Sequence, residues 1–216
     1  MGRLKLGVLI SGRGSNLQAL IDAAADAAYP AEIALVVSNV AGVMGLQRAE
    51  KAGIATAVVD HKAFDGRQSF EDALHETLSA AGVELVCLAG FMRLLTDGFV
   101  GRWHDKLINI HPSLLPAFKG LDVQQRAIDA GARFSGCTVH FVRPAMDAGP
   151  IIAQAVVPIH GDDTDASLSA RILEQEHKLF PLAVRLIAEG RARVIDERVV
   201  IDDAVAPATA MINPSD

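Results

Sequence analysis

Short apolar runs alternate with amphipathic segments through the first half of the chain. Residues 6–10 are apolar and lead into a polar, glycine-rich segment at 11–16, after which Leu17, Leu20 and Ile21 recur at helical spacing. This order indicates a strand, a glycine turn and a helix. The same alternation then predicts helices at 44–52 and 65–82 and strands at 33–37, 55–59, 85–89 and 107–110.

The pattern changes after Gly136. Apolar runs at 137–142 and 151–157 follow one another without a helical segment between them, which favours antiparallel strands. A long amphipathic helix is predicted next, with N-caps offered by residues 162–165 and an end near Glu189.

These segments predict an α/β fold with a doubly wound, mostly parallel, Rossmann-like sheet. The two later strands would give this sheet a mixed or antiparallel C-terminal extension. A small hairpin is expected at 193–201 and a tail at 206–216, so a single domain should span residues 1–205.

The composition narrows the class of protein. The 216 residues can bury a core without disulfides, and the two cysteines, Cys87 and Cys137, lie in apolar runs typical of buried free thiols. A formal net charge of -6 with few aromatic residues argues against a nucleic-acid partner. No run approaches membrane-spanning length and no signal segment is evident, so we expect a cytoplasmic protein without a membrane partner.

The segment Ser11-Gly12-Arg13-Gly14-Ser15-Asn16 indicates an anion site. Its glycines allow a tight turn, Ser15 and Asn16 can cap the helix that follows, and backbone N–H groups at that helix end can bind a phosphate. The segment lacks the full glycine spacing of a dinucleotide fingerprint and the lysine of a nucleotide-triphosphate loop, so a monophosphate fits it better. A plain turn between strand and helix is the alternative for this motif alone.

A second motif, Asn109-Ile110-His111-Pro112-Ser113-Leu114-Leu115-Pro116, supplies an amide and an imidazole at a strand end. Side chains alternate faces along a strand, so Asn109 and His111 should point the same way and Ile110 into the core. Downstream, Asp147 adds a carboxylate. These groups suit acyl transfer: Asn109 and His111 would stabilise a carbonyl oxygen as it becomes negative, and Asp147 would orient His111.

Each residue of this trio also has a plainer interpretation. A histidine or asparagine in a strand-end turn and an aspartate in a surface loop are common separately, and only the combination favours catalysis. His140, on the strand that leads to Asp147, can be a partner of the trio or a packed core residue. Iron binding by His111, His140 and Asp147 is a further alternative, which no short ligand spacing supports.

The motifs together resemble those of the phosphoribosylglycinamide formyltransferases, folate-dependent enzymes of purine synthesis. The resemblance runs nearly end to end and includes, beside the two motifs above, Leu88-Ala89-Gly90-Phe91-Met92-Arg93, Gly136-Cys137-Thr138-Val139-His140, Asp147-Ala148-Gly149-Pro150-Ile151 and Glu176-His177. It implies transfer of the formyl group of 10-formyltetrahydrofolate to the amine of 5-phosphoribosylglycinamide, without a metal. The implied partners are these small molecules, and the implied state is a monomer or homodimer.

The resemblance also assigns residues to the ribonucleotide and to catalysis. Asn109, His111 and Asp147 would act at the formyl group. The substrate phosphate would be held by Gly14, Ser15 and Asn16, with Glu176 contacting the same substrate. Without the resemblance, Glu176 would be interpreted as a solvated helix carboxylate.

For the folate, the resemblance points to Arg67, Met92, Arg93, Leu94, Leu95 and again Asn109. Apolar pattern alone would place Met92, Leu94 and Leu95 in the core. Residues 1–105 then form a phosphate-binding half and residues 106–205 a catalytic and folate-binding half. The chain departs from some relatives at Arg143-Pro144-Ala145-Met146, a loop expected to line the folate pocket.

Two other readings of the chain remain open at this point. A formyltetrahydrofolate hydrolase or a methionyl-tRNA formyltransferase would share the trio, although the tRNA enzyme is expected to have a basic surface and an extra C-terminal module, and the hydrolase an N-terminal regulatory domain. Outside this chemistry, a noncatalytic nucleotide-binding module or a dinucleotide oxidoreductase is disfavoured by the polar trio and the missing fingerprint, respectively.

Overall fold

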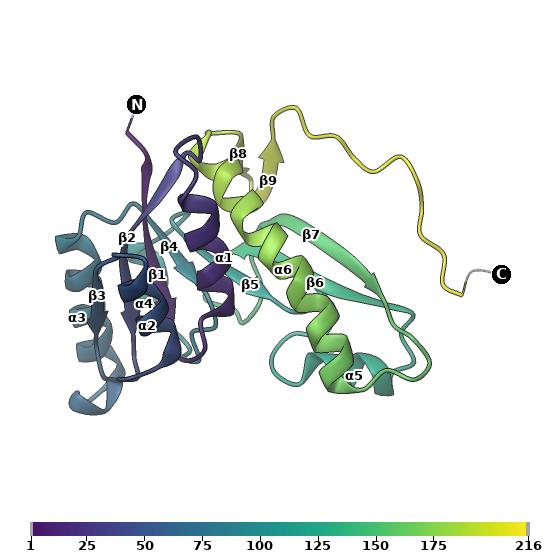
Figure 1. Ribbon diagram of the computed structural model, residues 1–216, viewed down its shortest axis with the longest axis horizontal. Helices are drawn as coiled ribbons and strands as arrows, with labels where there is room; N and C mark the ends of the chain where they lie inside the picture. Colours follow the sequence, from purple (N-terminus) through teal and green to yellow (C-terminus); the bar gives the residue numbers. More distant parts are fainter. Residues whose placement is uncertain (1, 215–216) are drawn as a thin grey trace.

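The computed structural model describes residues 2–214 (Figure 1). The strands are β1 (Leu4–Ile10), β2 (Ala31–Ser38), β3 (Thr56–Val58), β4 (Leu85–Leu88), β5 (Leu107–His111), β6 (Phe134–Phe141), β7 (Ile151–Pro158), β8 (Ala192–Ile195) and β9 (Arg198–Ile201). The helices are α1 (Ser15–Ala24), α2 (Met44–Lys51), α3 (Arg67–Ala80), α4 (Asp97–Arg102), α5 (Val123–Asp129) and α6 (Asp165–Ala188), with one 3-10 turn at His61–Ala63.

Within the described residues, seven strands form one sheet in the order β3-β2-β1-β4-β5-β6-β7. The strands from β3 to β5 are parallel, whereas β6 pairs antiparallel with both β5 and β7. Strands β8 and β9 pair separately as an antiparallel hairpin. The predicted doubly wound sheet, its antiparallel extension and the C-terminal hairpin are therefore confirmed.

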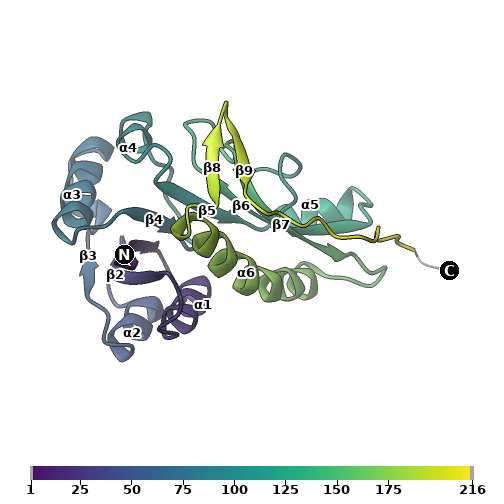
Figure 2. The ribbon, with the colours of Figure 1, turned by 90° about the horizontal axis from the view of Figure 1, so that it is seen from above.

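Helices cover both faces of the parallel part of the sheet, with α1, α2 and α6 on one side and α3 and α4 on the other (Figure 2). Each side has its own hydrophobic core, because alternate residues of one buried strand point in opposite directions. In β1, Leu6, Val8 and Ile10 belong to the core under α1 and α6, whereas Leu9 belongs to the core under α3.

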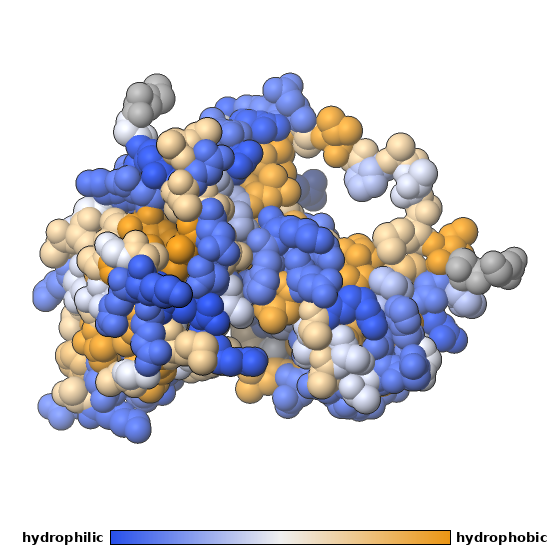
Figure 3. All heavy atoms as spheres, viewed as in Figure 1, coloured by the Kyte–Doolittle hydropathy of each residue, from blue (hydrophilic) through white to orange (hydrophobic). Residues whose placement is uncertain are grey.

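Helix α6 is amphipathic along its whole length. It buries Leu168, Ile172 and Phe180 against the sheet, and mostly polar side chains cover its outer face (Figure 3). Cys87 and Cys137 are buried free thiols, as expected, and burial raises the pKa of Cys137 to about 12. Among residues 2–214, no helix has the length and apolar character needed to cross a membrane.

Three local predictions were wrong or incomplete. The N-cap of α1 is Gly14, at a left-handed φ of 69°, so neither Ser15 nor Asn16 caps this helix. Helix α3 begins at Arg67 after an N-cap at Gly66, two residues later than the predicted start at 65. Helices α4 and α5 were not predicted, because each is shorter than two full turns of hydrophobic periodicity.

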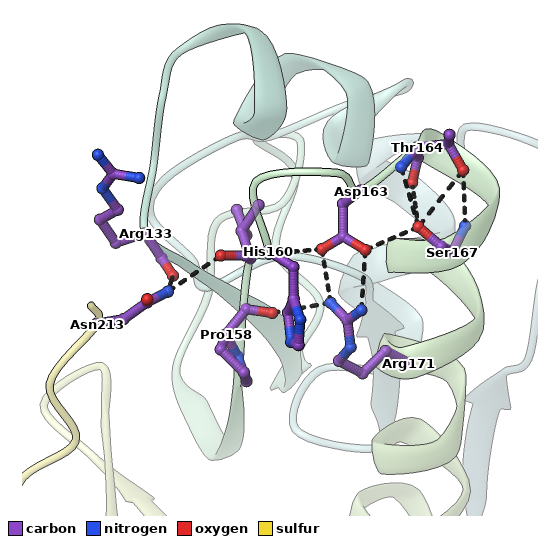
Figure 4. A network of polar contacts seen from close by, with 9 residues as sticks. Arg133, Pro158, His160, Asp163, Thr164, Ser167, Arg171 and Asn213 are labelled. Atoms are coloured by element: carbon purple, nitrogen blue, oxygen red, sulfur yellow. Dashed lines mark hydrogen bonds and ion pairs between the residues drawn. The ribbon is translucent and has the colours of Figure 1, made fainter. Parts of the chain in front are cut away.

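A polar network holds the start of α6 against the end of β7 (Figure 4). Arg171 donates to both carboxylate oxygens of Asp163, at 2.7 and 2.8 Å, and to the backbone oxygen of Pro158. Thr164 caps the helix by accepting from the Ser167 backbone N–H. The Arg171 guanidinium holds the pKa of the Asp163 carboxyl well below its usual range. The ion pair therefore fixes the direction in which α6 leaves the sheet.

Replacing Asp163 by Asn should lower the free energy of unfolding by about 2–3 kcal/mol at pH 7, because hydrogen bonds to a buried charge are lost. A depressed carboxyl pKa contributes stability that is present above the ordinary pKa of about 3.9 and is lost as the pH falls through the folded-state value. The difference between D163N and the parent should thus stay constant from pH 7 to 5 and shrink below pH 4. Denaturant titrations at pH 7, 5 and 3 measure it.

The exposed neighbour Asp162 provides the matched control, since D162N removes a charge from the same turn without removing a bond to Arg171. A D163N penalty no larger than that of D162N would contradict the assigned role of the ion pair.

Candidate functional site

Three loops meet where parallel strands end on one edge of the sheet. Strand order reverses between β1 and β4, which is where open α/β sheets form a crevice beyond the carboxyl ends of their strands. The loops after β1 and β4 are bonded to each other: Ser11 N–H donates to Gly90 O at 3.1 Å, and Ser11 Oγ accepts from Met92 N–H at 2.8 Å. The glycine loop is therefore fixed to the segment predicted to bind folate.

A cavity of about 480 Å³ opens at this edge. One wall is formed by the loop after β4, with Met92, Leu94 and Leu95. Met92 and Leu94 are exposed at 69% and 60%, so they line a cavity and are not part of the core. Apolar side chains that face solvent around a cavity are typical of a binding site for a flat organic ring.

The opposite end of the cavity carries the predicted polar groups Asn109, His111 and Asp147. Ile108 and Ile110 of β5 point into the core under α6, so Asn109 and His111 share the other face, as expected. Strand β6 pairs with β5 so that Asn109 lies directly opposite His140. The structure thus brings the amide, the imidazole and the carboxylate together, although Asp147 is 36 residues after His111 in the sequence.

The structure favours the interpretation of His140 as a partner of the trio, because its ring faces the Asn109 side chain. Its Nδ1 lies 2.9 Å from the backbone oxygen of Phe141, which can only accept, so Nδ1 carries the proton and Nε2 is an acceptor. Nε2 lies 3.4 Å from Nδ2 of Asn109. One amide N–H of Asn109 is thereby directed at His140, and its second N–H is left for another acceptor. Burial lowers the pKa of His140, which keeps the ring neutral.

His111 lies between two acceptors. Its Nε2 donates to the backbone oxygen of Phe118 at 3.0 Å, and its Nδ1 is 3.6 Å from Oδ2 of Asp147. The same carboxylate oxygen accepts the Gly120 backbone N–H at 2.7 Å. Asp147 therefore lies at ion-pair distance from His111, and a backbone hydrogen bond holds it in place.

The turn after β5 is stiff, as its prolines indicate. The Thr138 hydroxyl donates to Ser113 O at 2.7 Å and accepts from Leu115 N–H at 3.1 Å. Thr138 is the residue opposite His111 in the β5–β6 register. This pairing anchors the turn to the sheet immediately beyond His111.

The glycine loop lies at the N-terminus of α1, as predicted. At Gly14 a Cβ atom would meet the backbone of Gly45 at 2.7 Å, so α2 packs too closely for a side chain there. Arg48 of α2 supports the loop by donating to the backbone oxygen of Arg13 at 2.9 Å. The backbone N–H groups of the first turn of α1 remain directed outward for an anion.

Glu176 is buried, contrary to the solvated carboxylate that its helix position alone suggested. It accepts from Nδ2 of Asn16 at 2.8 Å, because α6 packs directly on α1. Burial raises the pKa of Glu176, and the charge of His111 acts in the opposite direction, so the two side chains are within electrostatic reach. Among the described residues, Oδ1 of Asn16 is buried without a hydrogen-bond partner. An unpaired buried acceptor beside a buried carboxylate indicates room for a ligand donor.

Arg67 lies apart from the other residues predicted for folate. It lines a second pocket, of about 560 Å³, beside the first cavity, whereas Arg93 lines the first cavity itself. Leu94 and Leu95 line both pockets, so the two form neighbouring parts of one surface depression.

Sequence reasoning missed the segment before α5. Gly120, Leu121 and Gln124 line the cavity, and Leu121 is 76% exposed. Backbone of positive φ at Phe118 and Asp122 shapes this segment. Its sequence has no periodicity and no motif chemistry, so only the fold reveals that it borders the site.

Within residues 2–214, no three His, Cys, Asp or Glu side chains are close enough to hold a metal ion, and this includes His111, His140 and Asp147.

The fold and the site define an α/β protein of the acyl-transfer class, with donors and an acid at one end of an apolar cavity. A family model described as formyl transferase matches residues 4–184. The chain belongs to the formyl transferase family, which confirms the family predicted from the sequence.

Individual relatives are similar over most of this chain. A protein of Haemophilus influenzae named phosphoribosylglycinamide formyltransferase is 44% identical, covering 97% of this chain and 99% of its own. The trifunctional purine biosynthetic protein adenosine-3 of Gallus gallus is 51% identical over 89% of this chain, and the aligned part spans 19% of that relative. A crystal structure of glycinamide ribonucleotide transformylase 1 from Symbiobacterium toebii aligns at a TM-score of 0.91 and 47% identity, covering 93% of this chain and 95% of that one.

The hydrogen-bond pattern predicts the state of His140 in solution. Because burial lowers its pKa, the ring should stay neutral as the pH falls through the ordinary histidine value of about 6.5, with the proton on Nδ1. Nitrogen-15 chemical shifts of the imidazoles between pH 8 and 5.5 report both properties. An ordinary titration, or a neutral ring protonated on Nε2, would contradict the proposed bond from Asn109.

Proposed function

We propose that the protein transfers the formyl group of 10-formyltetrahydrofolate to the amine of 5-phosphoribosylglycinamide, a step of purine synthesis. The observation that carries this proposal is the convergence of Asn109, His111 and Asp147 at one end of the cavity. The relatives that match this chain along nearly their whole length bear the name of this activity.

The formyl donor fits the cavity. A pterin ring is flat and has polar edges, and the wall formed by Met92, Leu94 and Leu95 offers apolar side chains beside backbone N–H and C=O groups. When bound, the folate supplies an electrophilic formyl carbon. Arg93 lines the cavity and Arg67 lines the adjoining pocket, and either guanidinium would suit a carboxylate of the folate tail.

The trio then acts on the formyl oxygen. The N–H of Asn109 that does not face His140 would donate to this oxygen as negative charge develops, which lowers the barrier because this donor is already in place. His111 would donate to the same oxygen through its Nε2–H, exchanging the backbone oxygen of Phe118 for it when the substrates bind. Asp147 would orient the His111 ring. In the net reaction one C–N bond forms and another breaks, and one proton passes from the amine to the folate nitrogen.

The ribonucleotide fits the adjacent end of the site. Backbone N–H groups after Gly14 would bind the phosphate with Ser15 and Asn16, and the buried carboxylate of Glu176 would accept hydrogen bonds from ribose or amide donors.

An assay with defined acceptors tests the function. Tetrahydrofolate formation, followed by absorbance, should depend on glycinamide ribonucleotide and should be absent or far slower with water alone or with methionyl-tRNA. Turnover with water equal to that with the ribonucleotide would favour a formyltetrahydrofolate hydrolase. Dependence on the tRNA would favour the tRNA enzyme.

Single substitutions test the roles of the trio. Asn109→Ala, His111→Ala and Asp147→Ala should each lower kcat by about 10²–10³, the loss expected when one preorganised donor to an oxyanion is removed. Near-parental kcat in His111→Ala would reject its assigned role. Circular dichroism and thermal unfolding of each variant separate loss of chemistry from loss of fold. Exposed Lys119→Ala, a change in the adjacent segment, is the control.

A further inference from the structure

Arg143 forms a charged cluster at the start of the Asp147 loop. Its Nε and Nη2 donate to the two carboxylate oxygens of Glu197 at 2.7 and 3.1 Å, and Nη2 also donates to Asp105 at 2.7 Å. Nη1 donates to the backbone oxygen of the preceding residue, Val142. The arginine side chain is only 11% exposed, whereas the side chains of Asp105 and Glu197 are 41% and 63% exposed. Its guanidinium is therefore held in one orientation by two other segments of the chain and by its own backbone.

The partners of Arg143 come from turns with positive backbone φ. Glu197 and Asp196 form the two-residue turn between β8 and β9, and both have positive φ, at 56° and 48°. Glycine, asparagine and aspartate are preferred at such positions, so Glu197 is the residue with an unfavourable backbone conformation. Asp105 is also at positive φ, which aspartate tolerates. From these two turns both carboxylates reach the same guanidinium.

Arg143 also packs on the return limb of its own loop. A Cβ atom at Gly149 would lie 2.0 Å from Phe141 O and 3.2 Å from Cγ of Arg143, so the two limbs touch with no space for a side chain. Between these limbs lies Asp147, whose inner face is tied to Gly120. The loop is therefore held by two sets of contacts: Asp147 accepts from Gly120, and Arg143, which also lines the cavity, donates to Glu197 and Asp105.

We propose that the β8–β9 hairpin holds the Asp147 loop in place through Arg143, which makes Arg143 a positioning residue for the formyl-donor end of the cavity. The hairpin lies beyond residues 4–184 that the family model matches. The kinetic consequence rests on the proposed function, whereas the effect on loop stability does not.

Arg143→Met is the informative variant, because methionine keeps an unbranched apolar stem against Gly149 and removes every donor. Glu197→Gln removes one charge, and Arg143→Lys keeps the charge but cannot reproduce the two-pronged contact. The matched control is Asp202→Asn, which removes an exposed ion pair with Arg193 on the same hairpin at 2.8 Å.

Amide hydrogen exchange tests, without any assay of activity, whether Arg143 holds the Asp147 loop in place. In the peptide spanning residues 142–150, Arg143→Met should speed exchange on the order of tenfold, the loss of one hydrogen bond to a charged group, with Glu197→Gln and Arg143→Lys between it and the parent. Asp202→Asn should leave this peptide unchanged. Unaltered exchange in Arg143→Met, or an equal change in Asp202→Asn, would overturn the proposal.

Steady-state kinetics test the consequence for the site. In Arg143→Met the KM for the formyl donor should rise several-fold, while the KM for the ribonucleotide stays at the parental value, because the acceptor binds at α1 and α6. Equal changes in the KM for the formyl donor and the KM for the ribonucleotide would indicate that the whole site is destabilised, and would count against the proposal. If the parental protein transferred no formyl group, the proposed function would be refuted. The exchange data would still show whether Arg143 holds the Asp147 loop.

Discussion

The antiparallel pairing of β6 with β5 is the constraint on which the site depends. It places His140 opposite Asn109 and Thr138 opposite His111. The first pair orients the amide, and the second anchors the turn that follows the imidazole. A shift of one residue in this register would exchange these polar side chains with Val139 and Phe141, which belong to the core under α6. Burial of those apolar residues therefore enforces the geometry of the polar ones.

The region proposed for the ribonucleotide is formed by side chains from opposite ends of the chain. Asn16 and Glu176 are 160 residues apart, yet their side chains are hydrogen-bonded at 2.8 Å inside the protein. This contact costs the burial of a carboxylate, which one hydrogen bond only partly offsets, as its raised pKa shows. A ligand that donates to Glu176 or to the unpaired Oδ1 of Asn16 would recover that cost. This unfavourable burial of polar groups is confined to Asn16 and Glu176, beside the glycine loop.

The sequence allowed the sheet, its antiparallel extension and the membership of the trio to be predicted, because these depend on local periodicity and on motifs. It did not reveal the burial of Glu176, since that results from packing of α6 on α1 across the molecule. It also did not reveal that Leu121 lines the cavity, because a leucine is expected to be buried and this one is exposed. His140 was undecided between core and partner until the register placed its Nε2 beside Asn109. What sequence could not supply in each case was a long-range contact.

The position of Asp147 follows from a balance of small energies. Its backbone has φ of 45°, a left-handed conformation that aspartate adopts more readily than most residues with a side chain. The hydrogen bond from Gly120 to its carboxylate contributes about 1.5–3 kcal/mol and favours the observed conformation. The approach of His111 to 3.6 Å is longer than a hydrogen bond and adds little by itself. One backbone hydrogen bond does not fix the distance between a carboxylate and an imidazole, and the contacts of Arg143 with Glu197 and Asp105 are in the position to provide a second attachment for the loop.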